Sequence, residues 1–276
     1  MINLLEPFQF SYMNTAMIAA TIVGILCAVL SVYLILKGWS LIGDALSHAV
    51  VPGVATAYCF QLPYLLSALI AAVCAALTML LLKTRSHVYS DAIIAFVLSL
   101  FFALGLLIIS INPTAISLDA IIYGQILTIS SEDLWQLLCI SSVSLCVIAL
   151  KWQDFMLIFF DETQAFICGL NCRLLRLLFF ILLTISVVIS LQAVGALLVT
   201  ALMITPAATA YLCSRRFGIV LIFSAIIGGL SGFLGSYLSY FLHSATAPLI
   251  VVIQTLFFVL IFLFTAQRDF VVRRTQ

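Results

Sequence analysis

The chain has 276 residues, of which 65% are hydrophobic and only 8% are charged, and its mean hydropathy is +1.33. Soluble globular domains carry about 25% charged residues, so the composition excludes that class. It predicts an all-α polytopic membrane protein, with one transmembrane domain over residues 1–276 that lies in the lipid bilayer. The net charge of +1 gives no reason to expect a nucleic-acid partner.

The first apolar segment covers residues 15–36 and stops at Lys37. Positively charged residues accumulate on the cytoplasmic side, so Lys37 is expected in the cytoplasm and the N-terminus outside. Gly38 and Ser40 interrupt the apolar segment, and the Ser40 hydroxyl is suited to cap a second helix that runs to about Phe60.

This second helix carries an acid and an imidazole near its start, Asp44 and His48. They are four residues apart and therefore share one helix face. Ionisable groups at membrane depth are costly and usually mark a pathway. A carboxylate with a neutral imidazole suits manganese, iron(II) or zinc, and the absence of a neighbouring sulfur ligand argues against copper(I). The alternative is a kinked helix with Asp44 bonded to a neighbour and His48 buried in neutral form.

Pro52 lies four residues after His48. Proline has no N–H, so it cannot bond the His48 carbonyl, which is left free to face an ion or water. Broken helices with bare carbonyls recur at the ion sites of transporters.

The third segment starts at Pro63 and ends at a basic turn, residues 83–85. His87 and Asp91 follow as a weaker copy of the first pair, with Asp91 better explained as a charge at a helix start. The fourth segment, residues 92–111, ends at a turn signal, Asn112-Pro113. Residues 114–133 are expected outside, where Glu132 and Asp133 either face an external partner or belong to a solvated loop.

The fifth segment, residues 134–150, leads to the most charged stretch, residues 151–176. Acids at its start and arginines at its close predict a short helix oriented with its dipole, and Gly169 is a candidate helix end. This stretch is either a cytoplasmic loop or a docking element. Cys168 and Cys172 have no second pair and are interpreted as structural.

Residues 177–191 and 194–212 form the next two segments, and Pro206, after Thr205, frees the Leu202 carbonyl as Pro52 does for His48. The eighth segment contains Gly228, Gly232 and Ser236, a spacing that suits close helix packing. His243 is expected outside, and residues 249–264 form the last segment.

The chain thus has nine apolar segments, which place the N-terminus outside and the C-terminus in the cytoplasm. Eight true spans remain if residues 44–60 do not cross fully. The basic residues that fall on one side in this topology are Lys37, Lys83, Arg85, Lys151, Arg215, Arg216, Arg273 and Arg274.

Two ligands do not satisfy a metal that needs four to six, but a two-fold dimer would place each Asp44 and His48 beside its copy. The sequence has no G-x-x-x-x-G-K-[ST] motif, so a pump built on it needs a separate ATPase. The charged stretch at residues 161–176 is the expected contact.

Three runs carry a family resemblance: KGWSLIGDALSHAVVPG at residues 37–53, GALLVTALMITPAATA at residues 195–210, and Phe160-Asp161-Glu162 continuing through Ala165 to Gly169. They resemble the permease subunits of manganese, iron and zinc ABC importers, the metal-ion ABC-3 family, which is related to the vitamin B12 permease. Residues 37–39, 112–113 and 254–258 look most similar to the branch that imports chelated iron and manganese.

The resemblance implies a bacterial inner-membrane permease that pairs with an identical or paralogous permease, a cytoplasmic ATPase dimer and an extracytoplasmic metal-binding protein. Asp44 and His48 would line the path of the transported manganese, iron or zinc, with no permanent cofactor. The third run would be a coupling helix at about residues 160–174, with Asp161, Glu162, Ala165 and Gly169 as its matching positions. The alternatives are a proton- or potential-driven carrier, with the pair as a proton relay, and a permease of this fold for another cargo such as a siderophore. An intramembrane metal enzyme lacks a third ligand and a general base.

Overall fold

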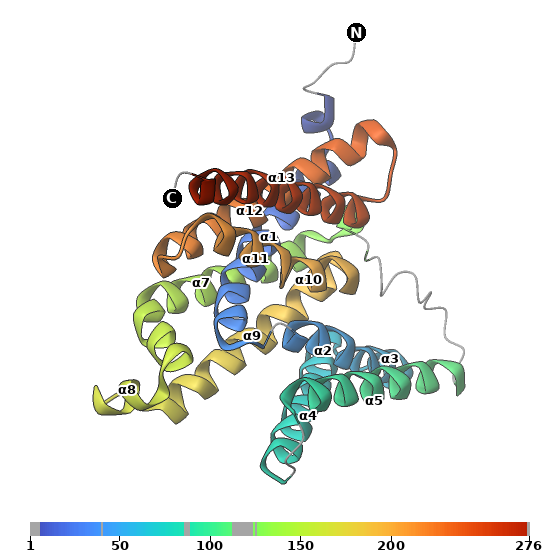
Figure 1. Cartoon of the computed structure of the whole chain (residues 1–276). Helices are drawn as coiled ribbons and strands as arrows, with labels where there is room; N and C mark the ends of the chain where they lie inside the picture. The colour runs from blue at the N-terminus through green and yellow to red at the C-terminus, as the bar shows by residue number, and fades with distance from the viewer. Residues whose placement is uncertain (1–5, 40, 86–88, 112–123, 125, 275–276) are drawn as a thin grey trace.

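The structure is a computed structural model that describes residues 6–39, 41–85, 89–111, 124 and 126–274. All regular structure in these residues is helical, which confirms the predicted all-α class (Figure 1). The helices are η1 (Glu6–Gln9), α1 (Ser11–Lys37), α2 (Leu41–Ala49), α3 (Val51–Phe60), α4 (Tyr64–Arg85), α5 (Ser90–Ile111), η2 (Ile126–Thr128), α7 (Ser131–Phe160), α8 (Glu162–Ile167), α9 (Cys172–Val194), α10 (Ala196–Leu202), α11 (Thr205–Cys213), α12 (Phe217–Leu242) and α13 (Thr246–Arg274).

Several sequence-based expectations concern residues outside the described part of the chain. These are the cap at Ser40, the ligand role of His87, the turn at Asn112-Pro113 and the external segment over residues 114–123.

Seven helices of the described chain are long and apolar enough to cross a membrane: α1, α5, α7, α9, the combined α10–α11, α12 and α13. The difference from the expected eight or nine spans has two sources. The described apolar stretch of α4, Leu65–Met79, is shorter than a full span. The segment that begins at residue 41 is divided into two short helices, α2 and α3.

Helix α1 is the centre of the molecule, and nearly three quarters of its most apolar stretch is buried. It packs backbone to backbone on α12, because Gly24 of α1 faces Gly228 of α12 and Ala20 faces Gly232. A β-carbon at Gly228 would lie only 2.7 Å from the Ala28 β-carbon and would also meet the Gly24 carbonyl oxygen. The small residues of α12 therefore serve close helix packing, as their spacing predicts.

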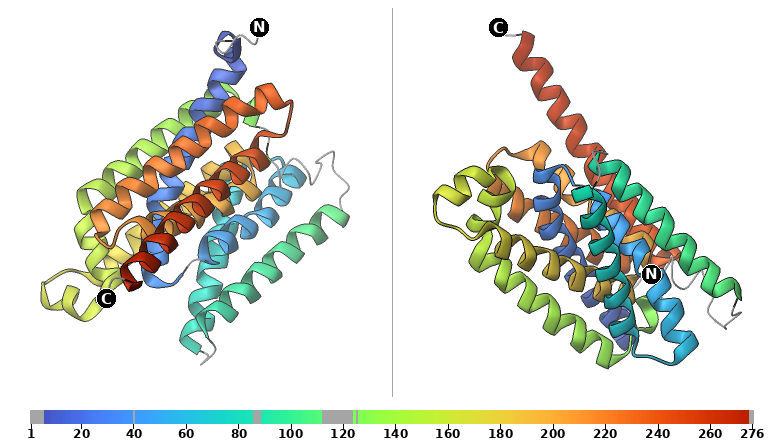
Figure 2. Two further views of the ribbon diagram at one scale, coloured as in Figure 1. Left: turned by 45° about the horizontal axis from the view of Figure 1, so that its top comes forward. Right: turned by 90° about the horizontal axis from the view of Figure 1, so that it is seen from below.

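The helix ends sort into two groups (Figure 2, left). The last turns of α1, α4 and α13 lie at one end of the molecule together with α8, and the first turn of α1 lies at the other. Lys37 and Arg85 close α1 and α4. We call the end with these two residues the basic end, and its position agrees with the predicted clustering of positive charge.

Candidate functional site

Asp44 and His48 lie on α2, the short helix that follows Lys37 at the basic end. The His48 Nε2 atom is 3.4 Å from the Asp44 Oδ1 atom, and about 30% of each side chain is exposed. Asp44 is three residues and His48 seven residues beyond the start of α2, which places them roughly 5 and 10 Å along the helix. The sequence spacing therefore does bring the two groups together on one face.

His48 packs against α5 and has one ring nitrogen without a partner among the described residues. Its ring contacts the edge of Phe102 on α5, with ring centroids 5.1 Å apart. Its Nδ1 atom is buried and has no hydrogen-bond partner among the described residues. A buried polar atom without a partner is costly in a membrane. The Asp44 carboxylate and the imidazole together suit manganese, iron(II) or zinc, as their chemistry predicts.

The break between α2 and α3 falls at Val50, two residues before Pro52. Two glycines allow neighbouring helices to approach this break. A β-carbon at Gly105 of α5 would lie 2.9 Å from the Pro52 nitrogen, and one at Gly53 would lie 2.5 Å from the Ser67 carbonyl oxygen of α4. Pro52 is itself buried. The break is thus held between α4 and α5.

A second break separates α10 from α11, directly before Thr205 and Pro206. Ile204 leaves the helical region there, with φ −122° and ψ −56°. The carbonyls at the end of α10 are satisfied from other helices. Ser31 of α1 donates to the Met203 carbonyl, and Gln254 Nε2 of α13 donates to the Ala201 carbonyl at 3.2 Å. These contacts fix the position of the break in the bundle.

The break between α10 and α11 lies beside the first turn of α2, which the sequence did not reveal. A β-carbon at Gly43, the residue before Asp44, would lie 2.9 Å from the Met203 β-carbon and 3.5 Å from its sulfur. The Met203 thioether therefore packs against the backbone of Gly43 at the start of α2. Met203 is far from Asp44 in the sequence, so the residues around Asp44 do not indicate this contact.

The other ionisable candidates do not join this pair. Among the described residues, no group of three or more His, Cys, Asp or Glu side chains is placed to hold a metal. Asp91 is exposed in the first turn of α5, as a helix-start charge would be, and His243 is an exposed cap at the end of α12. Cys168 and Cys172 are free thiols. One chain thus offers two ligands at the candidate site.

Helix α8 projects from the basic end beside the start of α9 (Figures 1 and 2). Asp161 caps it, because its Oδ1 atom accepts from the backbone N–H groups of Thr163 and Gln164 at 2.9 and 3.1 Å. Gly169 ends the turn in a left-handed conformation, φ 79°, which favours glycine. An ion pair between Glu162 and Arg176 ties α8 to α9.

Helix α8 is shorter than the coupling helix expected at about residues 160–174, because the chain turns at Gly169. The arginines do not close it, since Arg173 and Arg176 belong to α9. The large apolar side chains of α8 that are exposed are Phe166 and Ile167, at 76% and 78%. Sequence reasoning missed them because apolar residues are unremarkable in so apolar a chain.

The four residues predicted to couple all contribute to the structure of α8. Asp161 and Gly169 form its ends, Glu162 pairs with Arg176, and Ala165 is fully buried.

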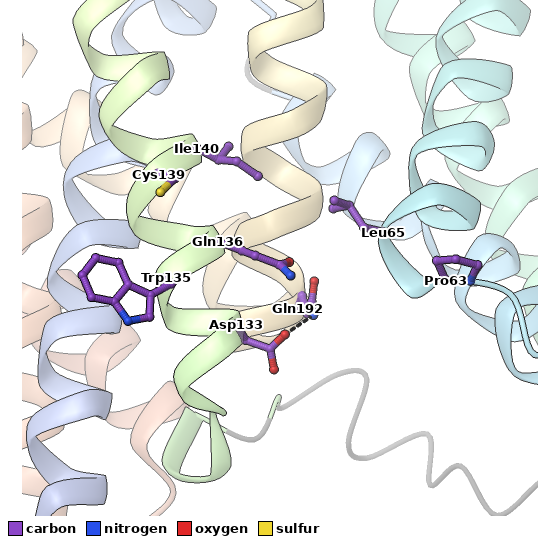
Figure 3. Close-up of a pocket in the computed structure, with 8 residues that line it drawn as sticks. All are labelled: Pro63, Leu65, Asp133, Trp135, Gln136, Cys139, Ile140 and Gln192. Carbon is purple, nitrogen blue, oxygen red and sulfur yellow. Dashed lines mark hydrogen bonds between the residues drawn. The ribbon is translucent and has the colours of Figure 1, made fainter.

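At the end opposite α8, a pocket lies between α7 and α9 on one side and the α3–α4 turn on the other (Figure 3). Asp133 of α7 and Gln192 of α9 point toward one another, and Gln192 Nε2 donates to Asp133 Oδ1 at 2.8 Å. The other Asp133 oxygen accepts from Ser130, which caps α7. Asp133 therefore links two helices, whereas Glu132 beside it is exposed. This pocket does not include Asp44 or His48.

Comparison with known proteins identifies relatives along nearly the whole chain. The profile of the ABC 3 transport family matches residues 9–265. A Haemophilus influenzae protein named "Probable iron transport system membrane protein" is 52% identical over 99% of this chain and 97% of its own length. The manganese transport system membrane protein MntB of Synechocystis is 39% identical over 93% of this chain and 84% of its own.

A solved structure also resembles the present one. PsaBC from Streptococcus pneumoniae, in complex with Fab, superposes with a TM-score of 0.85. The match has 32% sequence identity and covers 94% of each chain. The fold described above is therefore shared with a solved relative over almost its full length.

Proposed function

We propose that this chain, which belongs to the ABC 3 transport family, is the permease subunit of an ATP-driven importer of divalent metal ions. Iron and manganese are the proposed cargo, because relatives bear those names and the Asp44–His48 donor set suits both, with zinc as a third ion. The observation that carries the proposal is the pair itself. It is a carboxylate and an imidazole on a short broken helix, with one ring nitrogen buried and unpartnered among the described residues.

The proposed path lies between two permease subunits, identical or paralogous. One chain supplies two ligands, so a two-fold axis near α2 would bring two carboxylates and two imidazoles to one ion. Such a site holds the ion briefly, since transport needs binding weak enough for release. The end of α10, before the break at Thr205-Pro206, supports the start of α2 because Met203 lies against Gly43.

The proposed orientation has the basic end in the cytoplasm of a bacterial inner membrane, with the N-terminus outside and the C-terminus inside. An extracytoplasmic metal-binding protein would deliver the ion to the opposite end. The chain has no P-loop motif, so ATP hydrolysis is assigned to a cytoplasmic ATPase dimer. Closure of the ATPases would move α8 and open the path inward.

Helix α8 is the proposed ATPase contact, and Phe166 and Ile167 are its proposed anchors because both are apolar and largely exposed. Replacing Phe166 with alanine is expected to reduce co-purification of the ATPase at least about tenfold, since a buried aromatic anchor at an interface is worth about 2 kcal/mol or more. Affinity capture of tagged permease measures this. Leu177 on α9, also exposed, is the matched control. Equal ATPase recovery for Phe166→Ala and wild type would exclude Phe166 as an anchor.

The proposed function is tested by uptake of radiolabelled iron(II) and manganese(II) in cells that express the complete transporter. The cells carry either the wild-type ATPase or one in which the P-loop lysine is replaced. We expect the replacement to abolish uptake while the permease stays in the membrane at its normal level. Uptake that persists without ATP hydrolysis would identify a secondary carrier instead. Uptake of an iron siderophore but not of the bare ions would assign a chelate as the cargo.

A further inference from the structure

A long groove opens on the side of the molecule between α9 and the group formed by α2, α4 and α5. Its volume is about 1620 Å³. Pockets for small molecules usually measure about 300–1,000 Å³, so this groove is large enough for a bigger apolar ligand. Residues 172–185 of α9 border it, which corresponds to a length of about 20 Å along the helix axis. A hydrocarbon core is about 30 Å thick, so the groove runs through one leaflet and slightly beyond the midplane.

The walls of the groove are apolar and accessible from the membrane. Helix α4 contributes Val73 and Leu77, which are 48% and 53% exposed, and α9 contributes Phe180 and Ile181. Hydrocarbon chains are the natural neighbours of such walls at this depth.

The mouth of the groove, at the basic end, is charged. Arg173 and Arg176 line it, and Lys37 lies 6.0 Å from the ring centroid of Trp39, another lining residue. The only acid among its described lining residues is Glu162, which is paired with Arg176. Arg173 is exposed and has no ion-pair partner among the described residues. Two cations against one anion among the described lining residues, with Lys37 beside the lining residue Trp39, leave the mouth positive.

We propose that this lateral groove binds one anionic phospholipid of the cytoplasmic leaflet. The phosphate lies at Arg173 in the mouth, and the acyl chains follow α4 and α9 toward the midplane. Basic pockets between helices on the cytoplasmic side are suited to anionic head groups. The leaflet follows from the orientation proposed above. Because Glu162, Phe166 and Gly169 also border the mouth, the bound lipid touches the α8 segment.

The test uses the complete transporter, purified with its ATPases and exchanged into mixed vesicles of phosphatidylglycerol and a tenfold excess of phosphatidylcholine. Native mass spectrometry then counts the lipids retained on each permease chain. We expect one retained phosphatidylglycerol per chain. Arg173→Gln is expected to reduce retention about fivefold, since one basic residue near an anionic surface is worth about 1 kcal/mol. Arg215→Gln, an exposed arginine between α11 and α12, is the matched control and is expected to leave retention unchanged.

A second variant tests the position of the lipid without altering charge. Ala76 lines the groove, and Ala76→Trp fills it from the α4 wall, so it is expected to expel the lipid as well. Thermal unfolding of each variant checks that the fold is retained.

Equal retention of both lipids, or unchanged retention in both groove variants, would overturn the proposal. Displacement of the retained phosphatidylglycerol by soluble glycerol phosphate would also overturn it, because the site would then bind only the head group. A lipid bound to the isolated permease but absent from the complete transporter would also overturn the proposal, because a partner subunit would then fill the groove.

Discussion

Replacing Asp44 with asparagine is expected to reduce uptake of iron(II) and manganese(II) at least about tenfold, with permease and ATPase still assembled in the membrane. The change removes the charge but keeps the size of the side chain, so the packing of α2 on Met203 is preserved. Loss of a residue that only hydrogen-bonds to a metal ligand typically reduces metal affinity or activity about 10–100-fold. Loss of a direct ligand is expected to reduce them at least as much. Radiolabelled uptake, normalised to the amount of assembled transporter, measures the effect.

Two other polar residues serve as controls for this prediction. Asp91→Asn and His243→Ala change an acid and a histidine that are exposed and lie at helix ends. Both variants are expected to transport at the wild-type rate. If Asp44→Asn also transports normally, the pair is structural and the proposed metal path is wrong.

The imidazole allows a sharper test of direct contact with the ion. His48→Cys is expected to shift the preference of the transporter from manganese toward zinc, because thiolates favour softer ions. His48→Ala is expected to lower uptake of both. A merely structural histidine would give no change in metal preference. Competition between labelled manganese and unlabelled zinc measures the shift.

Replacing Gly228 with alanine is expected to have the second large effect, on assembly of the helix bundle. The added methyl group would meet the Gly24 carbonyl oxygen and lie 2.7 Å from the Ala28 β-carbon, so α1 and α12 must move apart. Overpacking costs about 1–3 kcal/mol in protein cores, and backbone atoms on both sides leave little room to adjust. This outweighs the roughly 1 kcal/mol that alanine gains over glycine in a helix. We expect a clearly lower unfolding temperature in detergent.

Gly218 on the same helix provides the matched control. A β-carbon there would meet only the Trp152 ring, at 3.7 Å, which is an ordinary contact. Gly218→Ala is therefore expected to leave stability unchanged or slightly increased. If the two alanine variants unfold at the same temperature, the close contact of α1 with α12 does not control stability.

The sequence by itself determined the class of the fold and the pairing of Asp44 with His48. Both depend on short-range physics. Apolar stretches of sufficient length must form helices in lipid, and residues four apart on a helix share a face. The same local rules indicated interruptions near Pro52 and Pro206, because a proline has no N–H to bond the carbonyl four residues before it. In the structure each proline stands in the first turn of the helix after the break.

Other features were decided only by the tertiary structure, because they depend on contacts between segments that are distant in the sequence. Met203 approaches Gly43 because the end of α10 packs against α2, and no periodicity along the chain encodes that approach. The outward direction of Phe166 and Ile167 depends on how Gly169 turns the chain and how the ion pair between Glu162 and Arg176 holds α8. The groove beside α9 likewise depends on how α2, α4 and α5 pack around that helix. In so apolar a sequence, composition identifies residues suited to the membrane, and packing alone decides which of them remain exposed.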